Sequence, residues 1–94
     1  MARESLTLGK RDARFLAIKR ALAGSLRERR RHKRLSQLGL ASLIGTSQSR
    51  VARMEAADPA VSLDLLVRSL LALGATRRDI ARAIEGKSLS KLPR

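Results

Sequence analysis

The sequence predicts a small all-α domain of five helices, the first of them long, and three observations carry this prediction. The chain has 94 residues, enough for one domain with a single core. Its apolar residues are almost all Leu, Ala, Ile and Val, with Phe15 as the one aromatic residue, and Leu and Ala favour helices over strands. Apolar residues also recur at spacings of three and four, which is the period of an amphipathic helix.

The first helix is expected from Arg11 to about His32. Its last third, within residues 27–34, is rich in Arg and Lys, and the C-terminal end of a helix dipole favours such cations. Its apolar stripe is formed by Phe15, Ile18, Leu22 and Leu26.

Two short helices should follow, each opened by a serine. Ser36 can cap a helix over residues 37–44, which Gly45 can end because glycine tolerates the left-handed backbone conformation. Ser47 can cap the next helix, over residues 48–56. These two helices and the turn between them form a predicted helix-turn-helix unit.

Within the second of these short helices, Val51 and Met54 should face the core. Pro59 should stop it, because proline disfavours a helical residue before it. Ser62 can cap a fourth helix over residues 63–73. The apolar stripe of that helix is formed by Leu63, Leu66, Leu70 and Leu73.

A fifth helix should begin at Thr76, which forms a capping-box pattern with Asp79, and should end at Gly86. Two interpretations of its isoleucines stay open, a dimer interface or closure of the monomer core. One face of this helix carries Ile80, Ala81 and Ile84.

The expected organisation is therefore one folded domain between two flexible ends. We expect a flexible arm over residues 1–10, the helix-turn-helix domain over residues 11–86 with its motif at 36–56, and a flexible basic tail over residues 87–94.

The charge of the chain is strongly and unevenly positive. The formal net charge is +13. Residues 1–34 carry twelve Lys or Arg against three acidic residues, residues 35–76 carry three of each, and residues 77–94 carry six against two. A polyanion is therefore the expected partner, and nucleic acid is favoured over an anionic membrane because the basic segments lack the aromatic anchors of an interfacial helix.

Several function classes are excluded or disfavoured. The chain has no cysteine, so it can form no disulfide and no thiolate metal site. His32 is the only histidine and lies in a cationic run without acidic partners at metal-ligand spacing. No paired carboxylates, catalytic triad or glycine-rich phosphate loop occurs. We therefore expect neither an enzyme nor a bound cofactor or metal.

The N-terminus and the apolar runs indicate no membrane segment. No apolar run approaches the roughly 18 residues of a membrane span. Residues 1–10 lack the apolar stretch of a signal peptide. The sequence therefore predicts a soluble cytoplasmic protein.

The segment from Leu35 to Glu55 carries the densest motif. It reads LSQLGLASLIGTSQSRVARME and resembles the Cro/phage-repressor family of helix-turn-helix domains, whose pattern is L-S-Q-x-x-L-A-x-x-(L/I)-G-x-S-Q-S-x-(I/V)-x-R-(apolar)-E. The resemblance extends more weakly from Leu26 to Leu73. The chain departs from the family at Leu38–Gly39 and at Ala56–Ala57, where the family has polar helix formers and Asn-Gly.

The resemblance implies that the helix beginning at Gln48 reads DNA bases. An amide at this position can bond both the N7 and the N6 amino group of adenine. Ser47 and Ser49 flank it, and Arg50 and Arg53 share the outward side of the helix; which arginine reads a base and which holds a phosphate stays open.

Three further residues take their roles from the family. The resemblance implies that Gln37 bonds a DNA phosphate next to Gln48. It also implies that Arg30 and Glu55 form a buried or half-buried ion pair that ties the first helix to the recognition helix.

The leading hypothesis is a sequence-specific transcriptional regulator, a repressor acting as a homodimer on a double-stranded operator with two half-sites. The alternative is an antitoxin of the HigA kind, which binds a toxin protein and represses its own operon. A third hypothesis, a helical protein-interaction module, is disfavoured by the charge.

Overall fold

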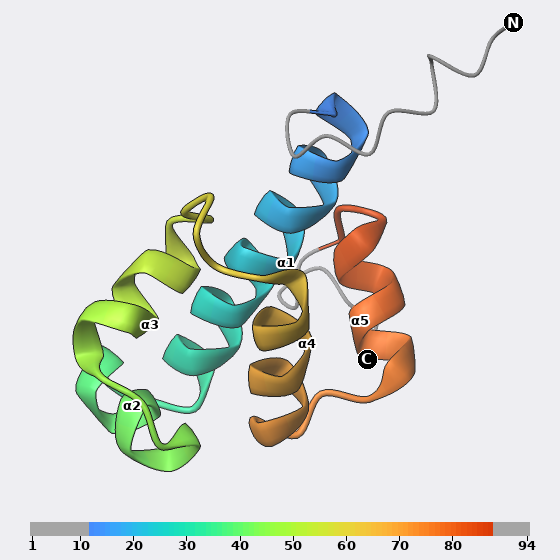
Figure 1. The fold of residues 1–94 in the computed structure, drawn as a ribbon. Coiled ribbons are helices and arrows are strands. Elements are labelled where there is room, and N and C mark those ends of the chain that lie inside the picture. Colours follow the sequence, from blue (N-terminus) through green and yellow to red (C-terminus); the bar gives the residue numbers. More distant parts are fainter. Residues whose placement is uncertain (1–11, 88–94) are drawn as a thin grey trace, which may run out of the picture.

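Five α-helices make up the fold in the computed structural model, which describes residues 12–87 (Figure 1). They are α1 (Ala13–His32), α2 (Gln37–Ile44), α3 (Gln48–Glu55), α4 (Leu63–Ala72) and α5 (Arg77–Ile84). The described residues contain no strand, so the all-α prediction is confirmed. The expected arm over residues 1–10 lies outside the described residues, as does the expected tail except for Lys87.

Each helix begins at a side chain that accepts a hydrogen bond from a backbone N–H of its first turn. The three predicted serine caps are confirmed at Ser36, Ser47 and Ser62. Thr76 and Asp79 form the predicted capping box, in which each side chain accepts from the other residue's backbone N–H, at 3.1 and 2.8 Å. Such caps satisfy donors that the helix itself cannot pair.

The long first helix begins two residues later than the apolar pattern indicated. Asp12 is its cap, with a carboxylate oxygen 2.8 Å from the backbone nitrogen of Arg14. Hydrogen bonds from the side chain and backbone of Arg14 lower the pKa of Asp12 to about 2. Arg11, where we expected the helix to begin, lies outside the described residues.

All five described helices end at a left-handed residue, and the N–H of the residue after it bonds a carbonyl five residues back. At α2, α4 and α5 the left-handed residue is a glycine, Gly45, Gly74 or Gly86. At α1 and α3 it is Arg34 (φ 59°) or Ala57 (φ 54°). A side chain in this conformation costs about 1–2 kcal/mol, so tertiary packing has to hold these two ends.

The helix α1 is the centre of the fold, because it contacts α3, α4 and α5 (Figure 1). The helices α2 and α3 pack against each other at one side of α1, and α5 lies at the other. The core between them is formed by Leu22, Ala23, Leu26, Leu40, Ala41, Val51, Met54, Val61, Leu66, Leu70, Leu73, Ala75 and Ala83.

The apolar face expected for α5 needs a correction. Its fully buried residue is Ala83, whereas Ala81 is exposed. Ile80 is half-buried against the core, and Ile84 is 44% exposed. The two isoleucines therefore have different environments, which the spacing alone does not distinguish.

The core contains a buried lysine that the apolar pattern of the sequence did not predict. Lys19 is 3% exposed, and its Nζ donates to the carbonyl oxygen of Pro59 at 3.3 Å. The bond joins α1 to the segment between α3 and α4, forty residues along the chain. A buried ammonium group needs such a partner.

Candidate nucleic-acid interface

The turn between α2 and α3 has the geometry that the motif predicted. Gly45 has a φ of 73°, in the left-handed region, and ends α2. The N–H of Thr46 then bonds the carbonyl of Ala41 at 2.8 Å. Ser47, two residues after Gly45, already caps α3. The chain therefore reverses within three residues and presents the N-terminus of α3 at the surface.

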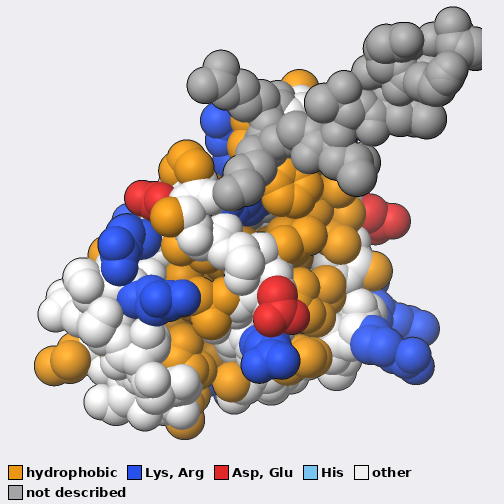
Figure 2. All heavy atoms as spheres, in the orientation of Figure 1, with side chains coloured by type: hydrophobic (Ala, Val, Ile, Leu, Met, Phe, Trp, Pro, Cys, Tyr) orange, Lys and Arg blue, Asp and Glu red, His pale blue; other side chains and the backbone are white. Residues whose placement is uncertain are grey.

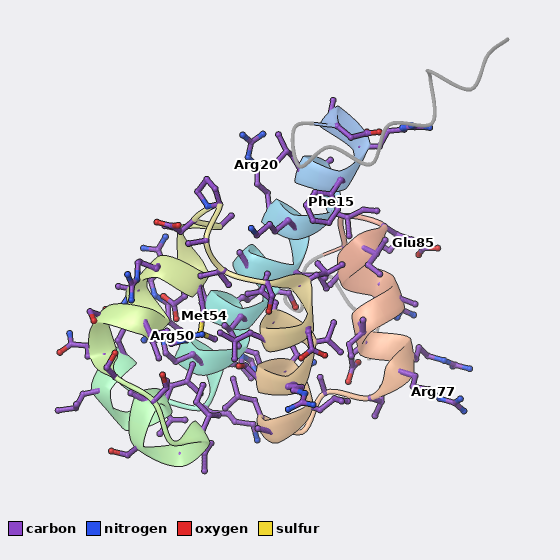
Figure 3. The ribbon with its side chains drawn as sticks, in the orientation of Figure 1. Phe15, Arg20, Arg50, Met54, Arg77 and Glu85 are labelled. Atoms are coloured by element: carbon purple, nitrogen blue, oxygen red, sulfur yellow. The ribbon has the colours of Figure 1, made fainter. Side chains whose placement is uncertain are left out.

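The helix α3 divides sharply into a buried and an exposed side. Val51 and Met54 are fully buried, and Met54 lies on the side that faces α1 (Figure 3). Four of the sequence-predicted site residues lie on the other side and are exposed. They are Gln48, Ser49, Arg50 and Arg53.

Ser47, the fifth predicted site residue, is exposed and serves the helix itself. Its Oγ accepts a hydrogen bond from the backbone N–H of Arg50 at 3.2 Å and lies 3.2 Å from the Oγ of Ser49. The structure therefore gives Ser47 a capping role that holds the first turn of α3 in place.

Gln37, the sixth predicted site residue, is half-buried at the start of α2. Its Nε2 donates to the Oε1 of Glu55 at 3.2 Å. This bond links the beginning of α2 to the end of α3. The sequence showed both residues, but a bond across eighteen positions depends on how the helices cross.

The ion pair between Arg30 and Glu55 is present and buried. The two side chains are 9% and 4% exposed. The Nε and Nη2 of Arg30 both contact the carboxylate, the latter at 3.1 Å, and Nη1 donates to the carbonyl of Leu35 at 2.8 Å. The hydrogen bond to Glu55 raises the pKa of Arg30. A bidentate pair of this kind fixes the orientation of α3 on α1.

Positive charge lies on both sides of the molecule. Figure 2 shows Lys and Arg side chains beside α3 and beside α5, with an apolar band between them. Arg50 and Arg53 form no ion pair with any of residues 12–87, so their guanidinium groups are available to an anion.

His32, the one histidine of the sequence, is exposed. In the part of the chain that the structure describes, no group of three His, Cys, Asp or Glu residues could hold a metal ion.

The family profile described as Helix-turn-helix matches residues 26–80, from the last two turns of α1 into α5. The chain belongs to the Cro/C1-type helix-turn-helix family. Neither a curated protein nor a solved structure matches it. As a Cro/C1-type helix-turn-helix protein, it is a DNA-binding transcription regulator. No helix within residues 12–87 of this regulator combines the length and the hydropathy of a membrane span.

Proposed function

We propose that this regulator is a sequence-specific repressor that binds, as a homodimer, an operator with two half-sites. The helix α3 enters the major groove in this proposal, with Gln48, Ser49, Arg50 and Arg53 toward the base edges. Gln37 and Ser47 lie beside the phosphate backbone. The protein acts in the cytoplasm, together with the DNA that it regulates.

The observation that carries the proposal is that α3 has one side buried against the core and one side exposed to solvent. Its buried residues and the pair of Glu55 with Arg30 hold the helix rigidly. Its polar residues are exposed. A reading helix needs both properties, because base contacts confer specificity only when the side chains are held in register with the groove.

The dimer is proposed because one reading helix is too short to contact more than a few base pairs. Eight residues cover only a few base pairs, and two such helices about 34 Å apart can enter successive major grooves. Ile84 on α5 is the proposed contact between subunits, because α5 lies on the other side of α1 from α3 (Figure 1). There this isoleucine, which is 44% exposed, can bury apolar surface in a dimer without covering α3. The antitoxin hypothesis uses the same DNA-binding surface, and no contact among residues 12–87 favours it over the repressor.

The experiment that tests the proposal is selection of bound duplexes from a random DNA pool. A dimeric reader should enrich an inverted repeat whose half-sites lie about one helical turn apart. Placing that repeat before a reporter gene should then lower transcription when the protein is present. Enrichment of no sequence would contradict specific reading, and a single half-site would contradict the dimer.

A further inference from the structure

A hollow of about 380 Å³ lies between α1 and α3. It is beside the proposed reading surface, which is formed by Gln48, Ser49, Arg50 and Arg53. Its lining comes from three arginines of α1 (Arg27, Arg30 and Arg31), from Gln37, and from α3. On the α3 side the lining side chains include the small Ala52 and Ala56. The two methyl groups leave room between the helices that larger residues would fill.

The arginines of this hollow differ in their electrostatic state. Arg30 is neutralised by Glu55, which also lines the hollow. Arg27 and Arg31 are exposed, and neither forms an ion pair with any residue that the structure describes. They lie four positions apart on α1, so their charges are neighbours and repel by a few tenths of a kcal/mol. An anion in the hollow would relieve this repulsion.

The dipole of α1 explains only part of this arrangement. Cations stabilise the last turn of a helix, and Arg29, Arg30 and Arg31 all lie in that turn. Arg27 lies before it and gains little from the dipole. The helix dipole therefore does not explain why Arg27 lies beside the hollow.

The hollow is continuous with the reading surface along α3. Gln48, Ala52 and Ala56 are spaced by four residues, so they lie along one stripe of the helix. The stripe begins at the residue proposed to read a base and continues, after one turn of about 5.4 Å, into the hollow. A ligand in the hollow therefore lies next to any nucleic acid that Gln48 contacts.

We propose that this hollow binds backbone phosphates of DNA, with Arg27 and Arg31 as the phosphate ligands. The proposal rests on the proposed function and adds to it a contact outside the helix-turn-helix unit. A guanidinium presents paired N–H donors that match phosphate oxygens, and its charge is permanent. This contact contributes equally to the affinity for every DNA sequence, because phosphates carry no base information.

The test compares two double variants that remove the same charge. Arg27→Ala with Arg31→Ala removes the two guanidinium groups of the hollow that form no ion pair. Arg77→Ala with Arg78→Ala removes two exposed arginines from α5, which lies on the other side of α1 from α3 (Figure 1). Fluorescence anisotropy then measures binding to a random-sequence duplex as a function of salt concentration.

The expected result is a shallower salt dependence for the hollow variant alone. Each subunit of the hollow variant loses two phosphate contacts, which reduces the slope of log K against log salt by about 1.8 for each bound subunit. The wild type should therefore lose about twelve-fold more affinity per bound subunit than this variant between roughly 50 and 200 mM salt. The α5 variant should keep the wild-type slope. A wild-type slope for the hollow variant, or an equal reduction for both variants, would overturn the proposal.

A charge-preserving variant gives a second measurement. Arg27→Lys with Arg31→Lys retains both cations and loses the paired donors, so the slope should stay that of the wild type while affinity falls. A slope reduced as far as in the alanine variant would contradict the phosphate contact. The proposed function fails separately, if the wild-type protein enriches no sequence from a random pool while the slopes still differ.

Discussion

At the scale of single residues, the buried pair of Arg30 and Glu55 does most to place α3. It joins α1 to the end of α3, and each partner has a further neutral partner, Leu35 or Gln37. Removal of one member leaves the other charge buried without compensation, and this cost exceeds the net stabilisation that the intact pair supplies.

We expect Arg30→Ala and Glu55→Ala each to lower the free energy of unfolding by about 3 kcal/mol. The double variant should lose clearly less than the two single losses added together, because the second substitution removes the stranded charge. Urea denaturation of the four proteins measures this coupling. Strict additivity would show that the pair contributes nothing in solution.

Gln48 is the residue that best distinguishes base contacts from phosphate contacts. Gln48→Ala should weaken binding to the selected operator by about 1–3 kcal/mol and leave binding to random DNA nearly unchanged. The reason is that a base-edge contact exists only on the correct sequence. Competition titrations with both DNAs measure the ratio. If the ratio does not change, then the helix beginning at Gln48 is not the reader.

At the scale of helices, the N-terminal boundaries follow from local chemistry and two of the C-terminal boundaries do not. Ser36, Ser47 and Ser62 cap the helices that their positions predicted, because a cap bonds a backbone group two or three residues away. The ends of α1 and α3 use Arg34 and Ala57 where glycine is the usual signal. Their left-handed conformations follow from packing, which no local pattern shows.

The start of α5 should make stability depend on pH. The backbone N–H of Thr76 lowers the pKa of Asp79 from 3.8 by its hydrogen bond, and Arg29, 3.3 Å away, adds to the effect. Because the folded-state pKa lies below the unfolded value, this stabilisation is present above pH 3.8 and is lost as the pH falls through the folded-state pKa.

Asp79→Asn should therefore cost about 1 kcal/mol at neutral pH. The difference in melting temperature between wild type and variant should shrink below pH 3.8, because the wild-type carboxylate becomes protonated. Thermal melts monitored by circular dichroism at a series of pH values measure this. A difference that is constant with pH would show that the charge of Asp79 does not stabilise the helix.

At the scale of the whole molecule, the arrangement of helices separates two surfaces. The helices α2 and α3 lie at one side of α1, and α5 lies at the other (Figure 1). A dimer formed through α5 would therefore leave α3, the proposed reading helix, exposed in each subunit. This is the arrangement that a two-half-site operator needs.

Ile84→Asp should convert the proposed dimer to a folded monomer. A half-exposed side chain contributes little to the monomer core, whereas a charge in an apolar interface between subunits is costly. Sedimentation velocity measures the mass, and circular dichroism measures the fold. Leu43→Asp is the matched control, because Leu43 is 56% exposed on α2, and it should remain dimeric. An unfolded Ile84 variant would assign this residue to the core.

The sequence alone determined the fold class, the order of the helices and the exposed side of α3. These depend on periodicity, caps and a dense motif, all of which act over a few residues. Only the tertiary structure decided that Lys19 is buried, that Gln37 is bound to Glu55, that Ala83 faces the core while Ile84 is exposed, and that Arg27 and Arg31 border a hollow. The physical reason is distance along the chain, because these features depend on packing between helices that are far apart in the sequence.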